Sequence, residues 1–169
     1  AHLMAELFEL HDRSRFEIFG FDWSREDGSA LRQRVVGAMD HFERIHGLDD
    51  ESAARLIASR EIDILVDLQG QTLGARANML AYRPAPIQIT YLGYPNTTGL
   101  PTVDYRITDA LADPPGRADE LNVERLLRLP RPFLCYRPEA KAPDPGPPPV
   151  LSRGYVTFGC FNNTLKLSD

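Results

Sequence analysis

Two segments of the sequence combine glycines, hydroxyls and amides in the way that sugar-binding and anion-binding loops do. The first is residues 70–76, Gly-Gln-Thr-Leu-Gly-Ala-Arg, which runs from a predicted strand into a predicted helix. Backbone N–H groups at such a junction can donate to an anion or a sugar hydroxyl. The spacing of its two glycines matches neither the dinucleotide fingerprint nor the Walker loop, so an ordinary strand-to-helix turn is the alternative interpretation.

The second segment is residues 92–99, Leu-Gly-Tyr-Pro-Asn-Thr-Thr-Gly, which also follows a predicted strand. It supplies hydroxyls, an amide side chain and backbone without helical or strand periodicity. It contains no base paired with a nucleophile. The segment is suited to holding a sugar or a peptide, and the alternative is a structural turn that ends near Pro101.

Lys166 is a third candidate because it follows the polar turn 162–164 at the end of a predicted strand. At that place an ammonium group can meet a phosphate as a flexible point charge. A solvated lysine is the alternative interpretation.

Signatures of other chemistries are missing from the sequence. The four histidines, at positions 2, 11, 41 and 46, form no HExxH motif, and there is no GxSxG nucleophile elbow of a hydrolase. Cys135 and Cys160 belong to no CxxC motif, so a metal site is not expected. Isolated thiols of this kind predict a reducing compartment and a buried structural role.

The elements that position these segments alternate between helices and strands. Helical spacing or capping signals predict helices near residues 3–10, 29–36, 50–57 and 75–81. Alternating or continuous apolar runs predict strands at residues 15–21, 41–45, 62–68, 87–92, 103–108, 125–129 and 155–161. This alternation predicts an α/β fold with a mainly parallel sheet. Five prolines among residues 143–149 predict an exposed linker.

Composition excludes several function classes. The 169 residues carry 19 basic and 24 acidic side chains, a net charge of −5, which argues against a general nucleic-acid binder. No apolar run approaches the roughly 20 residues that span a bilayer, and the first residues lack the pattern of a signal peptide. We therefore expect a cytoplasmic protein that contacts neither nucleic acid nor membrane.

Three segments together resemble the catalytic region of the protein O-GlcNAc transferase and SPINDLY family, glycosyltransferase family 41. They are residues 83–88 (Arg-Pro-Ala-Pro-Ile-Gln), residues 92–99, and residues 103–109 (Val-Asp-Tyr-Arg-Ile-Thr-Asp). The resemblance continues on both sides and covers essentially the whole chain.

The resemblance implies a GT-B architecture, in which two Rossmann-like lobes hold a nucleotide sugar between them. Residues 1–136 would form the amino-terminal lobe, residues 137–152 the Pro-rich linker, and residues 153–169 the beginning of the second lobe with its first strand. We expect the chain to be one piece of such an enzyme, behind tetratricopeptide repeats, and inactive in isolation.

The resemblance also implies roles for particular residues. Lys166 matches the lysine that contacts the donor diphosphate, where it would stabilise the leaving group. Gln71 stands where the O-GlcNAc enzymes have a tyrosine, and Asn163 where the animal enzyme has a glutamine. The family histidine near the reacting groups precedes the part that begins this chain, and His2 is not assigned its role. The full set implied for the donor and acceptor is Gln71, Thr72, Leu92, Gly93, Tyr94, Pro95, Asn162, Asn163 and Lys166.

The implied reaction moves a sugar from its nucleotide diphosphate to a Ser or Thr hydroxyl of a protein, with inversion and without a metal or cofactor. UDP-GlcNAc is the first donor to expect. The sequence of residues 95–105 is closer to SPINDLY, which implies GDP-fucose. A non-catalytic interaction module derived from this lobe is a further alternative, and self-association of the isolated chain is a hypothesis because its lobe interface would be exposed.

Overall fold

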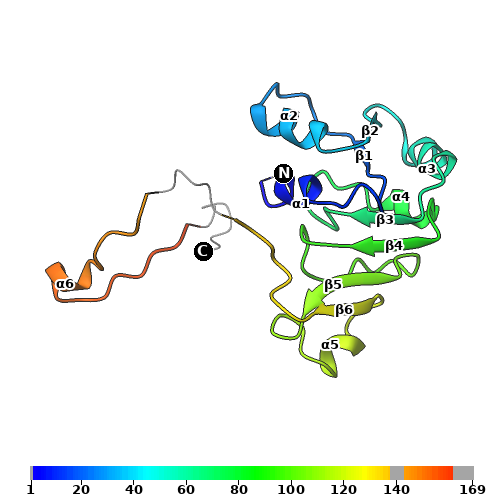
Figure 1. Cartoon of the computed structure of the whole chain (residues 1–169). Coiled ribbons are helices and arrows are strands. Elements are labelled where there is room, and N and C mark those ends of the chain that lie inside the picture. Colours follow the sequence, from blue (N-terminus) through cyan, green and yellow to red (C-terminus); the bar gives the residue numbers. More distant parts are fainter. Residues whose placement is uncertain (1, 138–142, 162–169) are drawn as a thin grey trace. The chain divides into compact units, whose positions relative to one another are not determined.

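The computed structural model describes residues 2–137 and 143–161 and divides the chain into two units, residues 1–137 and 138–169 (Figure 1). The first unit holds all six strands. In the second unit, the described residues form one short helix, α6 (Val150–Arg153).

All strand pairs in the described structure are parallel. One sheet has the order β1-β2, and the other has the order β3-β4-β5-β6, as Figure 1 shows. The strands are β1 (Phe19–Asp22), β2 (His41–Arg44), β3 (Ile64–Asp67), β4 (Ile87–Thr90), β5 (Tyr105–Asp109) and β6 (Arg125–Leu129). The α/β class with a mainly parallel sheet is therefore confirmed.

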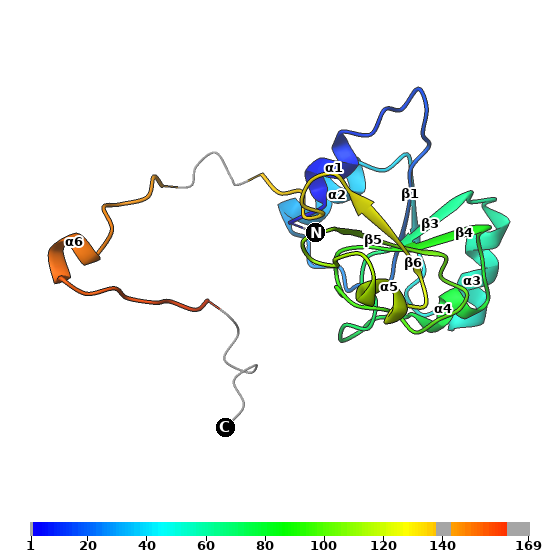
Figure 2. The same cartoon turned by 90° about the horizontal axis from the view of Figure 1, so that it is seen from below.

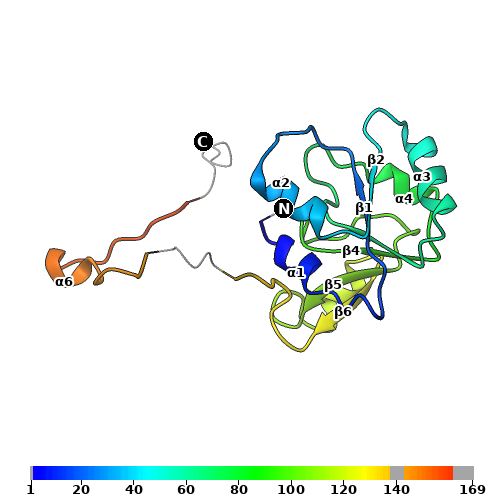
Figure 3. The same ribbon diagram turned by 45° about the horizontal axis from the view of Figure 1, so that its top comes forward.

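The longer helices begin where the sequence predicts. Ser29 caps α2 by accepting a hydrogen bond from the Arg32 N–H, and Asp49 caps α3 by accepting one from the Ser52 N–H. The helices of the first unit are α1 (Ala5–Glu9), α2 (Ala30–Gly37), α3 (Asp50–Ser59), α4 (Asn78–Ala81) and α5 (Arg117–Glu120). In Figure 2, α3, α4 and α5 lie on one side of the strands, away from α1 and α2. Figure 3 shows α1 beside α2, which it contacts.

A small apolar core joins the β1-β2 sheet to helices α3 and α4. Ile45, Ala53 and Met79 are buried there, and Phe21 and Trp23 pack against them. The Trp23 indole N–H donates to the carbonyl of Gly74 at 3.0 Å. The loop after β1 is thereby fastened to the loop after β3.

The structure corrects several expectations from the sequence. The predicted strand 155–161 is not formed, since no described residue pairs with it and Phe158 and Phe161 are exposed. A strand needs a neighbouring backbone, which local alternation does not supply. The four-residue helices α5 and α6 are too short to show periodicity and were not predicted.

Both cysteines are exposed, contrary to the buried role expected for them. Cys135 lies in the chain that leaves β6, and Cys160 lies in segment 155–161, which forms no strand. Neither place is covered by packing in the described structure. The described part contains no helix long and apolar enough to cross a membrane.

The two faces of the larger sheet differ in chemistry. The face that carries Gln88, Thr90, Arg106 and Thr108 is buried although these side chains are polar. The opposite face is mostly apolar and partly exposed, and it also carries Arg125, which lies over the Tyr105 ring. Its exposed apolar members are Ile64, Val66, Ile87, Leu127 and Leu129.

An ion pair balances the charge on the polar face. Arg106, whose side chain is 3% exposed, lies 2.6 Å from the Asp113 carboxylate, which also accepts a hydrogen bond from Thr108. Burial by itself would raise the pKa of Asp113, but the hydrogen bonds from Arg106 and Thr108 and the Arg106 charge together lower it. Asp113 is therefore held as an anion beneath the sheet.

We predict that Asp113→Ala lowers the free energy of unfolding by about 3 kcal/mol, because it leaves the Arg106 guanidinium buried without its partner. Urea unfolding followed by circular dichroism measures this loss. The matched control is Glu51→Ala, which breaks the exposed Arg55–Glu51 pair and should cost about 0.5 kcal/mol or less. Equal losses for the two variants would contradict a structural role for the buried pair.

Candidate functional site

The turn after β3 is organised by Asp67 at the end of that strand. One carboxylate oxygen accepts a hydrogen bond from the Gln69 N–H at 3.1 Å and the other from the Gly70 N–H at 2.7 Å. The Thr90 hydroxyl of the neighbouring strand donates to the same carboxylate at 3.3 Å. Asp67 thus fixes the start of the first predicted binding segment relative to β4.

The two predicted segments lie against each other at the carboxyl ends of β3 and β4, where α/β sheets bind ligands. A Cβ atom on Gly70 would lie 2.5 Å from the Cβ of Tyr94. A Cβ atom on Gly93 would lie 2.2 Å from the carbonyl oxygen of Leu68. Only glycine permits so close an approach at either position.

The residues predicted from the second segment present a narrow exposed edge. Gly93 and Pro95 are exposed, and Leu92 and Tyr94 are half-buried. Leu92 adopts a positive φ of 73°, which is strained for a side chain of this size. The surrounding contacts must therefore hold the backbone in this conformation.

Gln71 and Thr72 are also exposed, and Gln71 joins the two segments. The Gln71 side-chain amide donates to the carbonyl of Thr98 at 2.9 Å, and the Thr72 hydroxyl donates to the carbonyl of Gln69 at 3.0 Å. Both side chains keep an oxygen that can accept a hydrogen bond from a ligand. The structure therefore brings Gln71, Thr72 and residues 92–95 into one neighbourhood.

The far end of the second segment is anchored by Glu124, a residue to which the sequence analysis gave no role. Glu124 is 3% exposed and immediately precedes β6. Its carboxylate accepts hydrogen bonds from the Thr97 hydroxyl at 2.7 Å, from the Thr98 N–H at 2.7 Å and from the Thr98 hydroxyl. A glutamate that precedes a strand is usually exposed, so the sequence does not indicate that Glu124 is buried. Only the tertiary contacts reveal its role.

Asp109 and Tyr91 hold the chain that leaves β6. The Asp109 carboxylate accepts hydrogen bonds from the N–H groups of Leu111, Ala112 and Phe133, and the Tyr91 hydroxyl donates to the Phe133 carbonyl at 2.6 Å. The backbone N–H groups of Ala112, Phe133 and Leu111 lower the pKa of Asp109, and burial raises the pKa of Tyr91. We therefore assign both side chains the role of positioning the backbone at Phe133 rather than a role in proton transfer.

The remaining predicted donor residues, Asn162, Asn163 and Lys166, lie outside the described residues. Their roles stay predictions. Within residues 2–137 and 143–161, no cluster of three or more His, Cys, Asp or Glu side chains could hold a metal ion.

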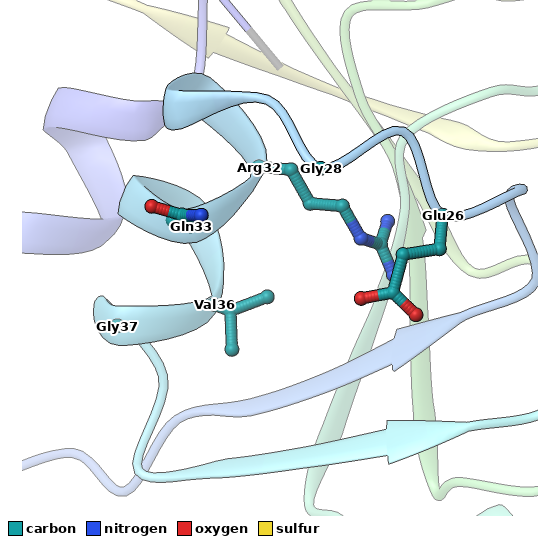
Figure 4. A pocket seen from close by; sticks show the side chains of 6 residues that line it. All are labelled: Glu26, Gly28, Arg32, Gln33, Val36 and Gly37. Carbon is teal, nitrogen blue, oxygen red and sulfur yellow. The ribbon is translucent and has the colours of Figure 1, made fainter.

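A shallow hollow of about 330 Å³ lies beside α2, away from the glycine-rich loops in the sequence (Figure 4). Arg32 and Glu26 extend into the same space in this view. The Arg32 guanidinium is already bonded to Asp22 at 2.7 Å and to the Ser24 hydroxyl at 2.9 Å. These contacts occupy the basic group, and the hollow is not assigned a ligand.

Comparison with known proteins extends this description. The model of a family described as glycosyl transferase family 41 matches residues 1–137. A probable UDP-N-acetylglucosamine–peptide N-acetylglucosaminyltransferase SPINDLY from Arabidopsis thaliana is 50% identical over 138 residues, which are 82% of this chain and 15% of that protein. The UDP-N-acetylglucosamine–peptide N-acetylglucosaminyltransferase of Caenorhabditis elegans is 40% identical over 79% of this chain and 12% of that protein.

A solved structure of a mutant O-GlcNAc transferase from Thermobaculum terrenum is similar in fold, with a TM-score of 0.80 and 36% sequence identity. The similarity covers 86% of this chain and 28% of that one, and it confirms the expected Rossmann-like lobe of GT-B type. The chain spans about 15% of the length of the SPINDLY relatives that it matches.

We predict that Gly93→Ala destabilises the protein by about 1–3 kcal/mol, because the added methyl group would overlap the Leu68 carbonyl oxygen. Thermal or urea unfolding measures this loss. The matched control is Gly37→Ala at the end of α2, where a Cβ meets nothing within 4 Å and α-helical propensity favours alanine. If Gly93→Ala were as stable as Gly37→Ala, the close approach of the two loops would be wrong.

Proposed function

Because the chain belongs to glycosyl transferase family 41, we propose that it is part of the catalytic region of a protein O-glycosyltransferase. The relatives are named as peptide N-acetylglucosaminyltransferases, and several are 44–50% identical to this chain over most of its length. The proposed substrates are a nucleotide-diphosphate sugar and a Ser or Thr hydroxyl of a protein.

The observation that carries this proposal is the contact between the two glycine-dependent loops at the carboxyl ends of β3 and β4. Gly70 and Gly93 bring these loops within backbone contact, so the surface near Gln71, Thr72 and Tyr94 is formed by both. Exposed amide, hydroxyl and peptide groups on a fixed backbone suit a polyhydroxylated sugar and an extended peptide. A base or nucleophile is not required of this lobe for such a role.

In the proposed reaction the acceptor hydroxyl oxygen forms a bond to the anomeric carbon of the sugar. The bond from that carbon to the diphosphate oxygen breaks, and the hydroxyl proton passes to a base. Attack from the face opposite the leaving group inverts the anomeric centre. Residues 92–95 would border the sugar and the acceptor, and Lys166 would stabilise the negative charge of the leaving diphosphate.

Two donors fit the relationships of the chain. UDP-GlcNAc accords with the names of the relatives. GDP-fucose is the second candidate, because the chain is closer to SPINDLY of Arabidopsis thaliana, at 50% identity, than to SEC of the same plant, at 33%. Gln71, which replaces the tyrosine of the O-GlcNAc enzymes, is the position at which the donors would be distinguished.

The proposal is tested by incubating the complete gene product with a protein acceptor and a panel of sugar nucleotides. We expect consumption of UDP-GlcNAc or GDP-fucose and a matching mass increase on the acceptor. Mass spectrometry of the acceptor and release of the nucleoside diphosphate measure the two sides of the reaction. Transfer from another sugar nucleotide would overturn both donor assignments, and absence of all transfer would favour the non-catalytic interaction module.

We predict that Lys166→Ala in the complete gene product lowers kcat by a factor that corresponds to about 2–4 kcal/mol of transition-state stabilisation. The physical reason is loss of the cation that offsets charge on the leaving diphosphate. Lys141→Ala removes the same charge from the Pro-rich segment and should leave kcat unchanged. Unchanged turnover in both variants would support the alternative interpretation, in which Lys166 is a solvated lysine.

A further inference from the structure

Glu124 is a buried carboxylate that is hydrogen-bonded to one loop. It is buried, and its hydrogen bonds come from two consecutive residues of one loop, Thr97 and Thr98. Among the described residues, no Lys, Arg or His forms an ion pair with it. Burying a carboxylate is unfavourable unless hydrogen bonds compensate for lost hydration, so this anion depends on the loop as much as the loop depends on it.

Thr98 is held from two sides. Its N–H and hydroxyl donate to Glu124, and its carbonyl accepts the hydrogen bond from the Gln71 amide at 2.9 Å. Its hydroxyl also accepts from the Leu100 N–H at 3.2 Å. Every polar group of this residue is therefore engaged, and Thr98 cannot move without breaking contacts to elements on both sides.

Thr97 extends the same anchor. Its hydroxyl donates to Glu124 and accepts from the N–H groups of Gly99 at 3.1 Å and Val123 at 3.3 Å. The loop is thus fastened immediately after Tyr94 and Pro95. On its other side, Gly93 is confined by the Leu68 carbonyl.

We propose that Glu124 is a positioning residue that acts through Thr97 and Thr98 to set the orientation of residues 93–95 toward the acceptor. This inference rests on the proposed function, since it assigns Glu124 to the acceptor side of that reaction. Hydrogen bonds to a charged acceptor are stronger than those to a neutral one, which suits a residue that must hold a strained loop. Gln71 holds the same residue from the other side, because its side-chain amide donates to the Thr98 carbonyl.

The decisive variant is Glu124→Gln in the complete gene product, with Glu120→Gln as the matched control. The first replacement keeps the shape but turns one carboxylate oxygen into an NH2 donor. This donor must face either the Thr98 N–H or the Thr97 hydroxyl, whose oxygen already accepts from the Gly99 and Val123 N–H groups. The second removes the same charge from an exposed position in α5. We expect kcat/KM for the protein acceptor to fall about 10- to 100-fold only in Glu124→Gln, with KM for the sugar nucleotide unchanged.

A second pair of variants separates positioning from general stability. Thr97→Val keeps the volume but removes the hydroxyl, whereas Thr97→Ser keeps the hydroxyl. We expect the valine variant to repeat the acceptor defect and the serine variant to restore transfer. A role in packing alone predicts the reverse order, because valine keeps the threonine methyl group that serine lacks.

Amide hydrogen exchange gives a readout that needs no activity. In Glu124→Gln we expect the Thr98 and Gly99 N–H groups to exchange about 10-fold faster or more, while exchange of the Ile45 N–H, which donates to the Asp22 carbonyl at 2.9 Å in the β1-β2 sheet, is unchanged. Unchanged exchange of the loop, or equal loss of protection in loop and sheet, would overturn the inference.

The kinetic outcomes are equally decisive. A rise in the KM for the sugar nucleotide together with a fall in kcat in both glutamine variants, or no change in transfer, would overturn the positioning role. If the unmodified gene product transfers no sugar at all, the proposed function fails. The exchange experiment alone then decides whether Glu124 holds the loop.

Discussion

The connection between β4 and β5 is a loop rather than a helix, and several buried polar side chains of the protein depend on this loop. Adjacent parallel strands are usually joined by a helix, which satisfies its own backbone hydrogen bonds. Residues 91–104 contain no helix, so their backbone N–H and carbonyl groups need other partners. The side chains of Gln71, Gln88 and Glu124 supply part of them, so polar groups are buried against this loop where a helix would present apolar ones.

Individual side chains show how this requirement is met. The Gln88 amide, fully buried on β4, donates to the carbonyls of Leu80 and Thr102. Glu124, immediately before β6, binds the same loop, and Arg106 with Asp113 balances charge on β5. A polar interior of this kind is stable only when its members are satisfied, which makes the loop conformation specific.

A specific loop is what the proposed transferase needs at this edge. A binding surface that is already ordered avoids the entropy cost of fixing it when substrate arrives. The glycines at positions 70 and 93 allow two loops to touch, and Glu124 and Gln71 keep the second loop in place. Membership of glycosyl transferase family 41 and the geometry of this edge thus point to the same role for one lobe of a two-lobed enzyme.

The sequence by itself determined the features that depend on near neighbours in the chain. Alternation of apolar residues located the six strands of the first unit, because successive side chains of a strand point to opposite faces of a sheet. Ser29 and Asp49 marked helix starts, because a cap bonds within the first turn of its own helix. Residues 70–76 and 92–99 each follow a predicted strand, and the carboxyl ends of parallel strands lie at one edge of a sheet. The family resemblance, carried by continuous segments, was readable for the same reason.

Only the tertiary structure decided which side chains support that edge. Glu124 and Thr98 are 26 positions apart, and Asp109 and Phe133 are 24 apart, so no local pattern connects them. The exposure of Cys135 and the absence of a strand at residues 155–161 also depend on what packs nearby. Burial and partner choice are set by the path of the whole chain, which the sequence of one segment does not contain.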